Sequence, residues 1–136
     1  MKEPQNTISF NEAKEMQQEY IKTRANSLNK ILDKEKIIKG KDVIDVTFDL
    51  ETLKEYIAYV EEEAEKKGLK GLGLRVCLGA YNKNEKVKTP GYSTVFFMPT
   101  YQSKSNKNSN LTVSNEIIEG VSGLNKGISG LPPHNL

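Results

Sequence analysis

Cys77 and His134 are the residues of this chain whose types are typical of covalent catalysis, and each is the only one of its kind. A catalytic cysteine needs an electropositive, partly exposed site, most often at the start of a helix. Cys77 instead lies in an alternating, strand-like stretch, and His134 is the third residue from the end. We therefore expect a structural thiol and no enzymatic activity, with an enzyme that uses Cys77 as the less favoured alternative. One cysteine and one histidine also exclude a disulfide framework and a structural zinc site.

Three aspartates, Asp42, Asp45 and Asp49, are spaced three and four residues apart, which on a helix would bring them together as a magnesium site. The sequence around them is that of a strand, on which they do not converge, and Asp49 is better placed to cap the helix that follows. The glutamates within residues 61–65 spread round several faces of that helix, so we expect them to be solvated. The sequence predicts no metal site and no cofactor.

A glycine-rich turn at Gly68, Gly71 and Gly73 follows a predicted helix and precedes a predicted strand. Phosphate-binding loops need the reverse order, and the lysine and hydroxyl of a P-loop are missing. These glycines are expected to end the helix and to let the strand pack closely, so the sequence predicts no nucleotide site of this kind.

Basic and aromatic side chains gather around a predicted hairpin with a polar loop at residues 82–91. Lysines neutralise phosphates and tyrosines stack on unpaired bases, so the loop is a candidate site for an anionic small ligand or single-stranded nucleic acid. A solvated lysine loop that blocks edge-to-edge aggregation is the competing interpretation. The candidate ligand-binding residues are Arg75, Lys83, Lys86, Lys88, Tyr92 and Tyr101.

The net charge of +2 conceals blocks of opposite sign. Residues 22–41 carry seven basic and two acidic side chains, residues 42–65 carry one basic and nine acidic ones, and residues 70–107 carry seven basic side chains against Glu85 alone. Opposite blocks attract within one fold or between two copies, and salt weakens both effects. We expect self-complementarity and a homodimer, with an unidentified protein as a further partner.

Two helices are marked by their N-terminal residues. Ser9 and Glu12 have the spacing of a capping box, which predicts a helix from there to about residue 33. Asp49 precedes the best helical period of the chain and Gly68 ends it, which predicts a second helix over residues 50–67.

Three strands are predicted, at residues 43–48, 71–81 and 92–98. The last two form an antiparallel hairpin. The first two are joined through the helix at 50–67, so we expect them to be parallel and the sheet to be mixed. The core face of the second strand is expected to consist of its even-numbered residues Leu72, Leu74, Val76, Leu78 and Ala80.

The opposite face of this sheet carries Arg75, Cys77, Phe96 and Met98, and it must be covered by the first helix, by the C-terminal tail or by another copy. The apolar stripe of the first helix is mixed with polar residues in its middle, which suggests packing on a partner or projection from the core. We therefore take Phe96, Met98 and Tyr20 as candidate interface residues.

After Pro99 the composition becomes polar and repetitive, and residues 111–136 contain four glycines and two adjacent prolines. We expect residues 102–136 to form a polar linker and a tail with at most one helical turn. The predicted fold is α+β: a single domain over residues 1–101, ordered helix, strand, helix, strand, strand, with a small three-stranded sheet covered on one face by a helix.

The strand pair formed by residues 74–81 and 93–100 resembles one found in small uncharacterised bacterial proteins. This resemblance implies a bacterial origin and no particular activity.

No stretch of the chain approaches the ~18 uncharged apolar residues of a membrane span, and residues 1–10 do not have the pattern of a secretory signal. We expect a cytoplasmic protein that does not enter the membrane. Because no nucleophile, base and orienting group can be assembled, the favoured function is a non-catalytic binding or protein-interaction module.

Overall fold

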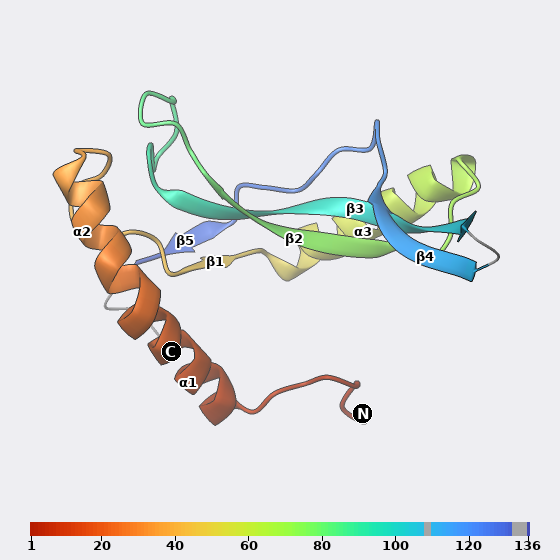
Figure 1. Cartoon of the computed structure of the whole chain (residues 1–136), viewed down its shortest axis with the longest axis horizontal. Coiled ribbons are helices and arrows are strands. Elements are labelled where there is room, and N and C mark those ends of the chain that lie inside the picture. The colour runs from red at the N-terminus through yellow and green to blue at the C-terminus, as the bar shows by residue number, and fades with distance from the viewer. Residues whose placement is uncertain (108–109, 132–135) are drawn as a thin grey trace. The chain divides into compact units, whose positions relative to one another are not determined.

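A computed structural model describes residues 1–107, 110–131 and 136 and shows an α+β fold, which confirms the predicted class. The elements follow one another along the chain as labelled in Figure 1. In chain order they are α1 (Phe10–Tyr20), the π-helical turn η1 (Ile21–Ala25), α2 (Asn26–Lys34), β1 (Asp45–Thr47), α3 (Leu50–Lys66), β2 (Gly73–Ala80), β3 (Ser93–Lys107), β4 (Asn110–Ile117) and β5 (Ile128–Gly130).

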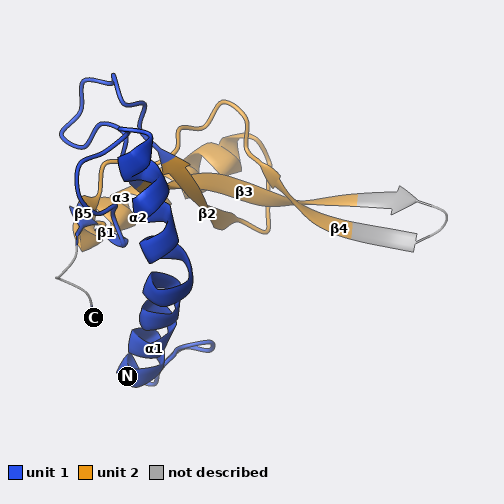
Figure 2. Ribbon diagram, turned by 60° about the vertical axis from the view of Figure 1, so that its left-hand side comes forward, with its two compact units in different colours: residues 1–46, 80–93, 129–136 blue, residues 47–79, 94–128 orange. Residues whose placement is uncertain are grey.

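The chain divides into two compact units (Figure 2). Unit 1 consists of residues 1–46, 80–93 and 129–136, and unit 2 consists of residues 47–79 and 94–128. Each unit combines segments that are far apart in the sequence.

Both predicted helix starts are confirmed. The Ser9 hydroxyl accepts a hydrogen bond from the Glu12 N–H at 3.1 Å, and the Glu12 carboxylate accepts one from the Ser9 N–H at 2.9 Å. At the start of α3, the Asp49 carboxylate accepts from the N–H and the hydroxyl of Thr52. Each cap satisfies backbone donors that have no partner inside the helix.

The three-stranded sheet has the order β2-β3-β4 and is antiparallel, so the prediction of a mixed sheet is wrong. Its membership also differs from the prediction, because β1 pairs with β5 in a separate two-stranded sheet. The parallel crossover through α3 was inferred from chain order alone. The partner of β1 comes instead from near the end of the chain.

The segment after Pro99 contains strands where a linker and one helical turn were predicted. β3 continues to Lys107 and pairs with β4 in a register that runs from Thr100 opposite Ile117 to Lys107 opposite Asn110. Two antiparallel strands satisfy each other's backbone groups whatever side chains they carry. A polar composition therefore did not exclude this hairpin.

The core of unit 2 lies between α3 and the sheet, which confirms the prediction of a helix on one sheet face. From α3 the buried residues are Tyr56, Val60 and Ala64, and Ile118 and Val121 join them from the segment after β4. The partly buried residues Leu69, Leu74, Phe97, Tyr101 and Leu124 pack around this cluster.

The predicted core face of β2 is only partly correct. Leu74 packs against the core, but Val76 and Leu78 are 60% and 88% exposed. β2 is an edge strand of the sheet, and the apolar cover of α3 is completed by Ile118 and Val121 rather than by the rest of β2.

Polar contacts connect distant segments of unit 1. The Gln17 side-chain amide on α1 donates to the Asp45 carboxylate at 3.2 Å, and the Gln17 side-chain oxygen accepts from the Leu136 N–H at 2.7 Å. Its buried apolar residues are Ala25, Ile38 and Val43. Across residues 1–107, 110–131 and 136, no helix is both long and apolar enough to cross a membrane.

Candidate functional site

The candidate site is a hollow of about 630 Å³ in unit 1, which we call the lysine hollow. It is formed where the turn after α2 meets the loop between β2 and β3. Its lining residues are Asp33, Lys36, Ile37, Ile38, Lys39, Lys83, Pro90 and Tyr92. Small-molecule sites have volumes of roughly 300–1,000 Å³ and combine apolar walls with a few polar groups, as this hollow does.

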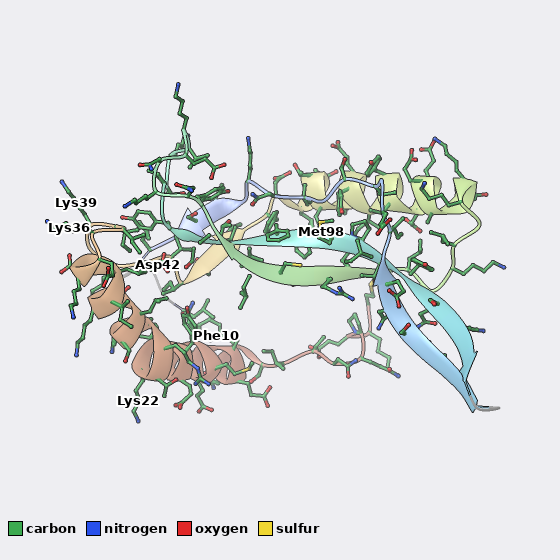
Figure 3. The ribbon with its side chains drawn as sticks, turned by 45° about the horizontal axis from the view of Figure 1, so that its top comes forward. Phe10, Lys22, Lys36, Lys39, Asp42 and Met98 are labelled. Atoms are coloured by element: carbon green, nitrogen blue, oxygen red, sulfur yellow. The ribbon has the colours of Figure 1, made fainter. Side chains whose placement is uncertain are left out.

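Lys36 is held in place by the way α2 ends. The Lys36 N–H donates to the Asp33 carbonyl at 3.0 Å and the Ile37 N–H donates to the Leu32 carbonyl at 2.9 Å, which is the hydrogen-bond pattern of a Schellman motif. The position occupied by Lys36 in this motif usually holds glycine, because its φ is positive, here 55°. A lysine there costs backbone energy relative to glycine. Lys36 and Lys39 both extend from the turn that follows α2 (Figure 3).

Gly91 lets the loop between β2 and β3 approach the turn after α2. Its φ is +81°, and a Cβ atom added there would lie 2.6 Å from the Ile37 carbonyl oxygen. No other residue type fits this conformation and this spacing without a backbone shift. The side of the hollow that contains Pro90 and Tyr92 therefore depends on a glycine.

A buried aspartate connects the end of the loop between β2 and β3 to the segment that follows α2. Asp42 is 3% exposed, and its carboxylate accepts hydrogen bonds from the Val43 N–H, the Ser93 N–H and the Ser93 hydroxyl. The Tyr92 hydroxyl donates to the Lys39 carbonyl at 2.9 Å. Neighbouring residues 92 and 93 are thus tied to residues 39 and 42, which fixes the Tyr92 ring at the hollow.

The electrostatic character of the hollow follows from its lining. Three lysines face one carboxylate, that of Asp33, and the apolar walls come from Ile37, Ile38 and Pro90. Lysine ammonium groups bind phosphate and carboxylate oxygens as point charges. The arrangement suits an anion that also carries an apolar or aromatic part.

The structure brings two of the six predicted ligand-binding residues to this hollow, namely Lys83 and Tyr92. Lys86 and Lys88 lie in the same loop but do not line the hollow. Arg75 and Tyr101 belong to unit 2, where the Arg75 guanidinium donates to the Asn115 carbonyl at 2.8 Å and Tyr101 packs against the core.

The predicted interface residues lie in different environments. Phe96 and Met98 are half-buried within unit 2, where Phe96 lies against Gly79 and Met98 against Gly123. Tyr20, at the end of α1, is 37% exposed.

The remaining candidates for chemistry are the thiol, the imidazole and the three aspartates. Cys77 is a half-buried free thiol whose Sγ lies 3.7 Å from the Arg75 carbonyl oxygen, and His134 lies outside the described residues. Asp42, Asp45 and Asp49 bind protein donors as given above. Among the residues that the structure describes, no three histidine, cysteine or acidic side chains are grouped as metal ligands.

The sequence prediction does not include Lys36 and Lys39, although both lie in the basic block of residues 22–41. They lie more than 40 residues from Lys83 along the chain, so no local pattern joins them. The one signal available was Gly91 beside Pro90, which marks a place where the backbone makes a tight turn.

Comparison with known proteins gave no match to a family model, to a curated protein or to a solved structure.

Proposed function

We propose that the protein is a non-catalytic binding module that takes a small anionic ligand in the lysine hollow. The observation that carries this proposal is the meeting of Lys36, Lys39 and Lys83 around one hollow with the Tyr92 ring. Two of these positions come from the turn after α2 and two from the loop between β2 and β3. A merely solvated lysine loop would not require a buried Asp42 and a tightly packed Gly91 to hold it against that turn.

The ligand class follows from the lining. Three ammonium groups match a phosphorylated or polycarboxylate molecule, and the apolar wall formed by Ile37, Pro90 and Tyr92 accepts a ring or an alkyl chain. The lysines are surface groups, so binding is expected to weaken steadily as salt is added.

The test is isothermal titration of the full chain at low ionic strength with pyrophosphate, citrate and a nucleoside triphosphate. We expect saturable binding with one site per chain. The variant Lys36→Glu/Lys39→Glu/Lys83→Glu should lose roughly tenfold or more in affinity, because each exposed charge pair contributes up to about 1 kcal/mol and reversal adds repulsion.

A matched control changes the net charge by the same amount away from the hollow. Lys86→Glu/Lys88→Glu/Lys126→Glu alters two lysines of the same loop and one of unit 2, none of which lines the hollow. Its affinity should stay within about twofold of wild type. Equal losses in the two triple variants would refute the proposal, since they would indicate a diffuse charge effect.

A titration with a single-stranded oligothymidylate tests the remaining alternative, which is nucleic-acid binding. Nucleic acid spreads over many lysines, so its affinity would fall in both triple variants and would depend steeply on salt. Binding of the oligonucleotide with no binding of the small anions would replace the small-ligand proposal by nucleic-acid binding.

Self-association is a second candidate function, favoured by a specific observation. Large apolar side chains on α1 and α2 are exposed, with Met16 at 64% and Ile31 at 57%. Neither side chain lines the lysine hollow, so self-association through them would use a different surface.

A further inference from the structure

The helical segment Phe10–Lys34 carries two oppositely charged exposed faces. Near its start, Ile8, Glu12, Glu15, Met16 and Glu19 line a shallow hollow of about 460 Å³, which we call the acidic face. Near its end, the exposed Lys30 and Lys34 lie four residues apart on one side of α2, and the exposed Ile31 lies three residues before Lys34. We call these three residues the basic face. Each face has an exposed apolar residue, Met16 or Ile31, beside its charges.

The two faces lie along nearly the same side of the segment. Met16 and Ile31 are fifteen residues apart, and four α-helical turns take 14.4 residues. The π-turn Ile21–Ala25 between them is wider than an α-turn, so it takes up the small excess. Both residues stay off the side of the helix that is covered by its own chain, where Ala13, Gln17, Ile21 and Ala25 follow at four-residue steps.

We infer that a second copy of this chain docks antiparallel along the segment Phe10–Lys34, with the acidic face of each copy on the basic face of the other. Placing Met16 opposite Ile31 of the other copy brings Lys30 to the level of residue 17 along the helix, between the exposed Glu15 and Glu19. It brings Lys34 to the level of residue 13, beside the exposed Glu12. The two-fold symmetry repeats these contacts at the other end.

A parallel pair would place like charges together. Glu15 would meet Glu15 and Lys30 would meet Lys30, which is repulsive in both halves of the contact. The charges therefore select the antiparallel arrangement and a second copy as the occupant. Because most of the attraction is between exposed charges, the dimer is expected to be salt-sensitive.

The first test measures mass by light scattering after size exclusion, with the full chain at low and high salt. We expect a dimer at low salt that dissociates as salt is added. A chain that stays monomeric at low salt up to the highest concentration reached would overturn the inference.

Charge swaps test the pairing itself. Glu15→Lys/Glu19→Lys and Lys30→Glu/Lys34→Glu should each weaken dimerisation about tenfold, because each places like charges in contact at both ends. Equimolar mixing of the two variants should restore a dimer, and so should both swaps combined in one chain. Failure of both restorations would contradict the inference, and circular dichroism on each variant establishes that the helices are intact.

The matched control is Glu61→Lys/Glu65→Lys on α3, which changes the same charge at the same spacing on another exposed helix position. Its dimerisation should be unchanged. A loss equal to that of Glu15→Lys/Glu19→Lys would attribute the effect to net charge and refute the inference.

Disulfide trapping tests the direction. In a Cys77→Ala background, chains with Met16→Cys mixed with chains with Ile31→Cys should cross-link to each other faster than either cross-links to itself. Faster formation of the two self-linked species would indicate a parallel pair and would overturn the antiparallel arrangement.

Discussion

The two compact units of this chain are stabilised in different ways. Unit 2 has a contiguous apolar cluster in which Val60, Ala64 and Ile118 are 3% exposed or less. In unit 1 the buried apolar residues are Ala25, Ile38 and Val43, and the buried carboxylate of Asp42 accepts hydrogen bonds from residues 43 and 93. The difference indicates that apolar burial holds unit 2 together, whereas directional hydrogen bonds position the segments that form the hollow in unit 1.

The largest expected effect is on the unit 2 core. Ile118→Ala removes a side chain that is 2% exposed and should lower the free energy of unfolding by about 2–5 kcal/mol. Urea denaturation followed by circular dichroism measures this loss. Leu78→Ala is the control, because Leu78 is 88% exposed and its loss should cost little. Equal costs would mean that the cluster around α3 does not form the core.

Asp42→Ala should act locally and somewhat less strongly. It removes the acceptor for the Val43 N–H, the Ser93 N–H and the Ser93 hydroxyl, and hydrogen bonds to a charged group contribute about 1.5–3 kcal/mol. Hydrogen exchange should accelerate at the amides of residues 43 and 93. The same substitution should weaken anion binding at the lysine hollow. Exchange that stays unchanged at both amides would show that Asp42 does not hold unit 1 together.

Tyr56→Phe should cost about 1 kcal/mol, because it removes the hydrogen bond from the Tyr56 hydroxyl to the Ser122 carbonyl at 2.8 Å. Burial, with a smaller electrostatic contribution from Tyr59, raises the pKa of Tyr56 above its ordinary value of 10.0. The unfolded chain therefore loses this proton first, and the wild-type stability should fall as the pH rises above about 10. The stability of the Tyr56→Phe variant should fall less steeply than that of wild type over this pH range, as urea denaturation measures, and an equally steep fall would contradict this assignment.

The smallest expected effect separates stability from binding. Lys36→Gly should raise the free energy of unfolding by about 0.5–1 kcal/mol, because glycine adopts the positive φ of this position without strain, yet it should weaken anion binding. Lys126→Gly is the control, since Lys126 has a φ of +66° and does not line the hollow. The Lys126→Gly variant should gain a similar amount of stability, and its affinity for the anion should be unchanged. A Lys36→Gly chain that binds as well as wild type would remove Lys36 from the site.

What the sequence predicts well is local. The capping box at Ser9 and the N-cap at Asp49 involve contacts three residues apart, and both helices begin where these residues indicate. The alternation of residues 71–81 likewise predicts β2, because a strand's side chains alternate whatever its neighbours are.

What the sequence did not predict depends on distant partners. The partner of β1 is β5, more than 80 residues away, and the polar strand β4 is defined by its pairing with β3. The alternation of β2 does not indicate which of its apolar residues are buried. Leu74 packs against the core and Leu78 is exposed, because the rest of the cluster around α3 is supplied by distant residues such as Ile118. For the same reason Lys83 and Tyr92 were predicted without Lys36 and Lys39.

The most direct test of the central claim, that the lysine hollow binds an anion, is a titration of the isotope-labelled full chain with pyrophosphate, followed by amide chemical shifts. We predict saturating shifts at residues 36–39 and at Tyr92, with the amides of residues 73–78 unchanged. Shifts centred on Arg75 and Lys104, or no saturating shift at all, would contradict the account.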